Sequence, residues 1–181
     1  MTDTAQSPPQ PAAAIPADDP RRRLAVASAD DPKRHHVSIA GDTYTILLSG
    51  AETAGRYCLI DMHVPPGGGP PPHRHDFEEM FTLLEGELEV TFRGKTSTIR
   101  AGSAVNIPAN APHAFKNAAA TPARMLCMAT PPGLDEFFLA IGDLVESRTA
   151  PPPKLTPEEI AERQKKAGSL LAKYRTEMVK V

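Results

Sequence analysis

The sequence predicts an all-β protein whose core is an antiparallel sandwich or barrel. Two observations support this fold class. Between residues 34 and 130 the apolar side chains mostly recur at every second position, which is the period of a β-strand. Turn signals that contain glycine interrupt this region at short intervals, a pattern typical of antiparallel sheets rather than of alternating strands and helices.

Residues 1–33 are expected to form a disordered, proline-rich arm. Six of the 20 prolines lie in this segment, together with a run of alanines and few residues that a core would bury. Such a composition does not offset the entropy lost on ordering the chain. We therefore divide the chain into this arm, a barrel with a short following helix at 34–147, and a linker with a C-terminal helix at 148–181.

The strands are expected between residues 34 and 130. Residues 57–64 are predicted to form one strand, and a second is predicted around Leu88, Val90 and Phe92, which alternate with polar residues. Breaks between short strands are expected at four dipeptides: Gly41-Asp42, Glu85-Gly86, Arg93-Gly94 and Ala101-Gly102.

After Pro132 the period of the apolar residues changes from two to that of a helix. Leu134, Phe137, Phe138 and Ile141 have helical spacing, and Gly142 supplies a stop signal. This pattern predicts a short amphipathic helix. Its two phenylalanines are expected either to cap the mouth of the barrel or to pack as ordinary core residues.

A proline-rich linker at 148–154 precedes a second helix. Thr156, Pro157 and Glu159 supply an N-cap, a proline in the first turn and the acid of a capping box. The residues expected on one face of this helix are Ile160, Ala167, Leu171, Tyr174 and Met178. We expect this face to pack on the barrel or on a second subunit.

Composition and charge narrow the range of functions. A chain of 181 residues with a net charge of -2 has the size of one domain and lacks the concentrated basic field that nucleic acids or anionic membranes require. The chain shows no membrane span and no secretory signal, so a cytoplasmic location is expected. Its two cysteines, Cys58 and Cys127, form one bridge at most and are expected to be reduced.

Three histidines and a glutamate form the clearest chemical signal. His73 and His75 occupy alternate positions of an extended segment, so their side chains point the same way, and Glu79 follows at an even offset. A second stretch supplies His113. Three imidazoles and one carboxylate favour a divalent transition metal and leave two positions open if its coordination is octahedral.

These two stretches resemble the two motifs of the cupin superfamily. The first motif is matched by Gly67, His73, His75, Glu79 and Gly86, and the second by Gly102, Pro108, His113 and Asn117. Asn110 replaces the middle glycine of the second motif, and asparagine tolerates the positive φ of a tight turn. The resemblance covers about residues 34–130 and includes the short spacer common among microbial single-domain cupins.

The resemblance implies an antiparallel jelly-roll barrel, also called a double-stranded β-helix. It also implies that His73, His75, Glu79 and His113 bind one divalent metal, which is Fe, Mn, Ni, Cu, Co or Zn. Glu78 lies at an odd offset from His75 and is expected to face the opposite side of the strand. His35 and His36 are interpreted as ordinary histidines beside a basic segment.

A largely apolar substrate pocket is expected over the metal. By strand alternation, Phe81 and Leu83 share the face of Glu79, and Phe115 shares the face of His113. His63 is a candidate for proton transfer at the pocket mouth, although a partly exposed strand residue is the simpler interpretation.

The first functional hypothesis is a dioxygenase resembling quercetinase-like cupins, acting on a small oxygen-bearing aromatic or diketone-like molecule. Glu79 is expected to bind the metal and to accept a proton. The alternatives are a metal-dependent lyase or isomerase, in which the metal acts as a Lewis acid, and a non-catalytic module that binds a small molecule. A homodimer is expected, because barrels of this kind often pair through their sheet edges.

Overall fold

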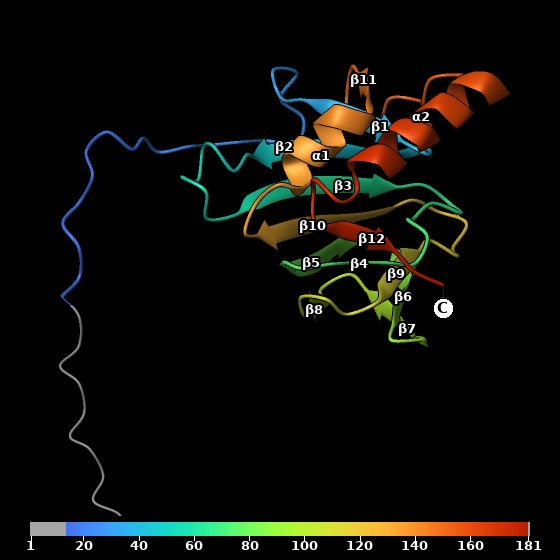
Figure 1. Ribbon diagram of the computed structural model, residues 1–181, viewed down its shortest axis with the longest axis horizontal. Coiled ribbons are helices and arrows are strands. Elements are labelled where there is room, and N and C mark those ends of the chain that lie inside the picture. The colour runs from blue at the N-terminus through green and yellow to red at the C-terminus, as the bar shows by residue number, and fades with distance from the viewer. Residues whose placement is uncertain (1–13, 181) are drawn as a thin grey trace, which may run out of the picture.

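The computed structural model describes residues 14–180, and these fold into two antiparallel β-sheets that enclose one core (Figure 1). The strand order of the larger sheet is β11, β1, β2, β3, β10, β5, β8, and that of the smaller sheet is β12, β4, β9, β6, β7. The all-β jelly-roll expectation is confirmed.

The strands are short and linked by turns, as the sequence predicts. In the larger sheet they are β1 (His36–Ile39), β2 (Asp42–Leu48), β3 (Cys58–Val64), β5 (Glu78–Glu85), β8 (Ala104–Ile107), β10 (Ala123–Thr130) and β11 (Asp143–Val145). In the smaller sheet they are β4 (His73–His75), β6 (Glu87–Phe92), β7 (Lys95–Arg100), β9 (His113–Lys116) and β12 (Thr176–Met178).

The core between the sheets contains the apolar side chains of alternate strand positions. The largest fully buried ones are Phe81, Ile60, Met62, Leu83, Leu88, Ile107 and Met125. Because both sheets contribute to this cluster, burial of these side chains stabilises the pairing of the sheets as well as each sheet.

Helix α1 (Leu134–Ile141) begins and ends where the periodicity predicts. The backbone N–H of Gly142 donates to the carbonyl of Phe138 and ends the helix. A Cβ at Gly142 would lie 2.8 Å from the Cβ of Val37, so a larger residue would not fit between α1 and β1. The helix thereby packs closely on the larger sheet.

Helix α2 (Pro157–Leu170) has the predicted capping box. The Thr156 hydroxyl accepts from the backbone N–H of Glu159, and the Glu159 carboxylate accepts from the backbone N–H of Thr156. The guanidinium of Arg163 donates to both oxygens of Asp143 at 2.6 and 2.7 Å. In Figure 1 α2 lies next to α1 and β11, so the helix docks on its own barrel.

The sequence-based expectation for residues 171–178 is wrong, because the helix does not continue to Met178. Arg175 has a φ of 57°, which turns the chain out of the helix. Residues Thr176–Met178 form β12, which pairs with β4 and places Met178 opposite His73. The physical reason is that β4 is a short strand whose outer edge has unpaired backbone groups, and β12 satisfies them.

The N-terminal arm is described only in part. Residues 1–13 lie outside the described residues, and residues 14–33 contain no helix or strand. Within 14–33 the side chain of Ala29 is buried, and Asp30 forms an ion pair with Arg148 at 2.7 Å. The arm therefore contacts the start of the linker that follows the barrel. No helix within residues 14–180 has the length and apolar character that would allow it to cross a membrane.

Candidate metal centre

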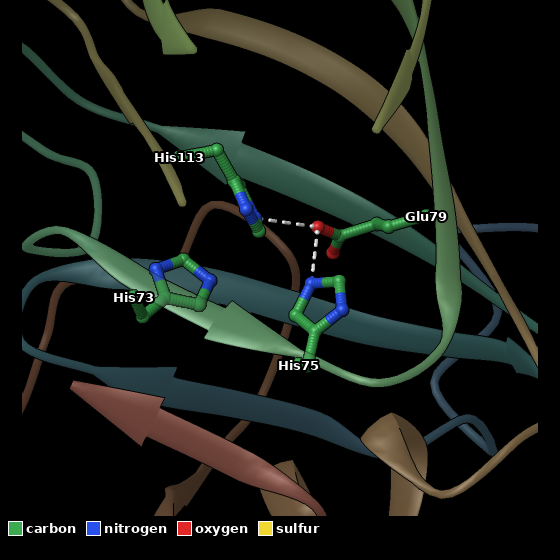
Figure 2. A group of neighbouring side chains, drawn as sticks. All are labelled: His73, His75, Glu79 and His113. Carbon is green, nitrogen blue, oxygen red and sulfur yellow. Dashed lines mark hydrogen bonds and ion pairs between the residues drawn. The ribbon is translucent and has the colours of Figure 1, made fainter. Parts of the chain in front are cut away.

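The four motif side chains converge inside the barrel from both sheets. His73 and His75 lie on β4, His113 lies on the neighbouring strand β9, and Glu79 lies on β5 of the larger sheet. One nitrogen or oxygen atom from each residue lies within 4.8 Å of those of the other three. Figure 2 shows the three rings and the carboxylate directed at one point. The predicted convergence of these residues is confirmed.

Backbone carbonyls orient each of the three imidazole rings. The Nδ1 atoms of His73, His75 and His113 lie 3.0, 3.0 and 2.9 Å from the carbonyl oxygens of residues 71, 77 and 111. A carbonyl only accepts, so Nδ1 carries the proton and donates. Nε2 then has a free lone pair, which is the form of histidine that binds a metal.

Glu79 presents one carboxylate oxygen to two of these nitrogens. Its Oε2 lies 3.1 Å from Nε2 of His75 and 3.1 Å from Nε2 of His113 (Figure 2). With the proton of each ring on Nδ1, these contacts place two lone pairs against a buried anion. Such an arrangement is stable only with extra protons or with a cation between the atoms.

The electrostatics of the cluster suit a cation. Burial by itself raises the pKa of Glu79, but His113 and His75, which donate to its carboxylate when Nε2 also carries a proton, outweigh burial and hold the pKa well below its ordinary value. Burial, together with the nearby His113, lowers the pKa of His73 to about 4. A neutral histidine beside an ionised carboxylate is the donor set that a divalent transition metal prefers, so the residues fit the implied metal.

Sequence reasoning missed Cys127, which contacts the other oxygen of Glu79. The buried thiol of Cys127 lies on β10 and donates to Oε1 of Glu79 at 3.2 Å. Burial raises the pKa of this thiol well above its ordinary value, so it is a neutral donor. The contact depends on the pairing of β10 with β5, which local periodicity does not reveal.

The second-motif asparagines hold the loops beside the cluster. Asn110 has a φ of 67°, as expected of the residue that replaces glycine, and its N–H donates to the carbonyl of His75 at 2.7 Å. The buried amide of Asn117 donates to the carbonyls of Val64 and Thr121. These bonds fix the segment that leads into His73.

A cavity of about 210 Å³ opens onto the cluster. His73, His75 and Glu79 line one part of it, and most of the remaining wall is apolar. The other lining residues are Ile39, Tyr44, Met62, Pro70, Pro71, Phe115, Leu134, Phe137, Phe138, Ile141, Ala167, Leu171, Thr176 and Met178. Phe137 and Phe138 of α1 therefore face the cavity, one of the two roles considered for them.

The four residues expected in the substrate pocket have different positions. Phe115 lines the cavity, and its ring contacts that of Phe81 edge-on at 5.6 Å. Phe81 and Leu83 are 1% exposed and belong to the core beneath the cavity wall. His63 is on β3 next to Met62, which does line the cavity, so strand alternation turns His63 to the outer face.

Glu78 lies away from the cluster, as its odd offset predicts. Its carboxylate accepts from the side-chain amide of Asn106 and from the backbone N–H of Ala109. These bonds hold the turn within the second motif in place. Glu78 is therefore no competitor of Glu79 for the metal.

Residues 60–129 match the cupin domain family, and this stretch contains all four clustered residues. The chain contains a cupin domain. The recognised resemblance is therefore confirmed for the barrel.

Two curated proteins are similar to part of this chain. An uncharacterised protein of Methanocaldococcus jannaschii is 31% identical over 75 residues, which are 41% of this chain and 60% of that protein. The dimethylsulfoniopropionate lyase DddW of Ruegeria pomeroyi is 40% identical over 68 residues, 37% of this chain and 45% of the lyase. The chain thus spans about half the length of these relatives.

Among solved structures, the polyketide cyclase RemF of Streptomyces resistomycificus has a similar fold. The TM-score is 0.53 at 23% identity, and the likeness covers 82% of this chain and 99% of the cyclase. At this identity the similarity shows the shared fold.

Proposed function

We propose that this cupin is a metal-dependent enzyme whose substrate is a small, largely apolar molecule that binds the metal through oxygen. The observation that carries the proposal is the position of the donor cluster, which lies in the wall of an otherwise apolar cavity. Open metal positions beside an apolar cavity allow a substrate to be held at its polar end and packed along the rest of its surface.

His73, His75, Glu79 and His113 would hold the metal. The ion is one divalent transition metal from the series Fe, Mn, Ni, Cu, Co and Zn, all of which accept imidazole and carboxylate ligands. When bound, it supplies a Lewis acid and, if redox-active, a centre for oxygen chemistry. Both oxygens of Glu79 already have partners in the cluster and in Cys127, which favours a ligand role over the proton-accepting role expected from the sequence.

The cavity wall supports a substrate without a large net charge. No lysine or arginine is among the lining residues of the described chain. The polar lining groups outside the cluster already have partners, since the Tyr44 hydroxyl donates to Asp42 and the Thr176 hydroxyl donates to the carbonyl of Tyr174. Binding would thus depend on apolar contact and on the metal.

The C-terminal segment covers the cavity and supports an enclosed reaction. Ala167 and Leu171 reach the cavity from α2 and the following turn, and Met178 reaches it from β12. Two ion pairs join this segment to β4 and the residue that follows it. Arg74 on β4 pairs with Glu177 on β12, and Asp76, just after β4, pairs with Arg175, just before β12. A covered site excludes water from the reacting atoms.

The reaction that we propose first is a dioxygenase reaction on an aromatic or diketone-like substrate. Three imidazoles and one carboxylate with open metal positions support it. The second candidate is a metal-dependent lyase, and the observation that favours it is the 40% identity to the lyase DddW over 68 residues.

The test begins with protein purified without chelator and without a nickel affinity column. Its metal content is measured, and the protein is then loaded with each metal of the series in turn. Oxygen uptake with diphenols, flavonols and diketones supports the dioxygenase. Product formation under anaerobic conditions, with no oxygen uptake in air, selects the lyase. Turnover by none of the loaded forms, together with saturable substrate binding, would contradict both reactions and leave a binding module.

A further inference from the structure

We infer that Cys127 is a positioning residue for the metal centre, acting through the hydrogen bond from its thiol to Oε1 of Glu79. This inference rests on the proposed metal site and extends it to a residue outside the two motifs.

The two oxygens of Glu79 have different partners. Oε2 faces Nε2 of His75 and of His113, each at 3.1 Å, and Oε1 faces Sγ of Cys127 at 3.2 Å. Glu79 is 4% exposed, so water does not replace a lost partner easily. A buried carboxylate oxygen that accepts a hydrogen bond is held in place, and one without a donor is free to turn. The thiol thus keeps Oε2 directed at the histidines.

The sheet register explains why this cysteine reaches the carboxylate. On the β5–β10 pair, Glu79 lies opposite Ala129 and Phe81 lies opposite Cys127. Glu79 and Cys127 are therefore diagonal neighbours on the face that points into the barrel, a separation that side chains can bridge. β10 lies between β3 and β5 in the larger sheet, so the thiol is presented by a strand paired on both sides.

Cys58 is a natural control for Cys127. Both thiols are unbridged and 0% exposed, and the two cysteines lie on adjacent strands, β3 and β10. Cys58 lies beside Asp135, at the start of α1, and within residues 14–180 no hydrogen bond joins it to the four clustered residues. Replacing either cysteine by alanine removes one buried sulfur atom, but only the change at Cys127 removes a hydrogen-bond donor to Glu79.

The experiment compares Cys127→Ala, Cys127→Ser and Cys58→Ala in the full chain with Co²⁺ as the probe. Co²⁺ affinity is measured by competition with a chelating dye, the visible absorption spectrum reports the ligand field, and thermal unfolding without metal reports folding. Cys127→Ala is expected to weaken Co²⁺ binding about 10- to 100-fold and to change the spectrum, as loss of an outer partner of a ligand does. Cys127→Ser keeps a donor and is expected to restore the wild-type spectrum.

Cys58→Ala is expected to match the wild type in affinity and spectrum, although its unfolding temperature falls. Wild-type affinity and spectrum in Cys127→Ala would overturn the inference, as would equal weakening in Cys58→Ala or a failure of serine to restore binding. If the alanine variant does not fold, Cys127→Val, which fills the space without a donor, takes its place in the comparison. Absence of Co²⁺ binding by the wild-type chain would refute the metal site itself, and with it this inference.

Discussion

Each histidine of the cluster is fixed by two independent features of the chain. Strand alternation sets the direction of the side chain, and a carbonyl two residues away binds Nδ1 and sets the orientation of the ring. Glu79 is fixed by contacts from both sheets, because His113 lies on the smaller sheet and Cys127 on the larger one. Backbone groups and neighbouring side chains thus orient all four residues toward one point.

Asn117 holds the loop beside the metal site, and Asn117→Ala is expected to disturb this site and to lower the stability of the fold. Its buried amide bonds the carbonyls of Val64 and Thr121 and accepts from the N–H of Ala119. Loss of these partners for buried backbone groups is expected to lower the free energy of unfolding by about 3 kcal/mol. The measurement is urea unfolding of the metal-free protein. An unchanged midpoint would show that water replaces the amide without cost.

Asp42 is expected to make stability fall as the pH rises from about 4 to 6. Burial raises its pKa to about 6 from 3.8, against the hydrogen bonds from Tyr44 and Gly69. The native state therefore holds this proton more tightly than the unfolded state, and the stability it contributes is complete below pH 3.8 and lost above pH 6. The expected loss is about 3 kcal/mol.

Comparison with Asp42→Asn isolates this contribution from the other titrating groups. The difference in unfolding free energy between the variant and the wild type is expected to grow in favour of the variant between pH 4 and pH 7. Chemical unfolding at several pH values measures it. Curves that stay parallel over this range would contradict the assignment.

The positions of individual side chains can be predicted from the sequence where the geometry is local. The pair His73 and His75 follows from the period of a strand, and the left-handed turn at Asn110 follows from its residue type. Cys127 was not predicted, because its contact depends on the non-local register of β5 and β10. The orientation of His63 could not be predicted either. Its place in the sequence, just before the first motif, does not show which face of β3 its side chain occupies.

Helices and strands, like single residues, can be predicted where their signals are local. The start and end of helix α1 can be predicted from the sequence, because its apolar spacing and its glycine stop are local signals. The end of α2 cannot be predicted from the sequence. Tyr174 and Met178 continue the helical spacing, although α2 ends at Leu170 and the chain turns at Arg175. What decides the outcome is the free edge of β4, which lies about 100 residues earlier in the sequence.

The segment from α2 to β12 is expected to control access to the metal. Deletion of residues 156–181 removes Ala167, Leu171 and Met178 from the cavity wall. Because no α2 side chain is buried, we expect the barrel still to unfold cooperatively. Release of bound metal to excess chelator is expected to accelerate roughly 10-fold or more, since opening of the cover no longer limits it.

A deletion of residues 1–24 is the matched control for this prediction. Residues 14–24, the part of this segment that the structure describes, do not line the cavity, so the rate of metal release is expected to stay at the wild-type value. Stopped-flow absorbance with a coloured chelator measures both rates. Equal rates for the C-terminal deletion and the wild type would mean that metal exchange occurs by another route.

The two sheets end in open edges that favour association. β11, β8, β12 and β7 are the outermost strands of the described sheets. Leu144 on β11 is 71% exposed, an apolar side chain on an unprotected edge. The homodimer expected from the sequence stays a prediction. Light scattering is expected to give twice 19.4 kDa, and a monomer at micromolar concentration would contradict it.

The most direct test of the metal centre is the metal content of the full chain and of a His73→Ala, His75→Ala double variant, both purified without added metal or chelator. Elemental analysis is expected to find about one equivalent of a divalent transition metal in the wild type and almost none in the double variant, while circular dichroism shows the same β-sheet in both. A His63→Ala variant is expected to retain the metal. Stoichiometric metal in the double variant would contradict the site.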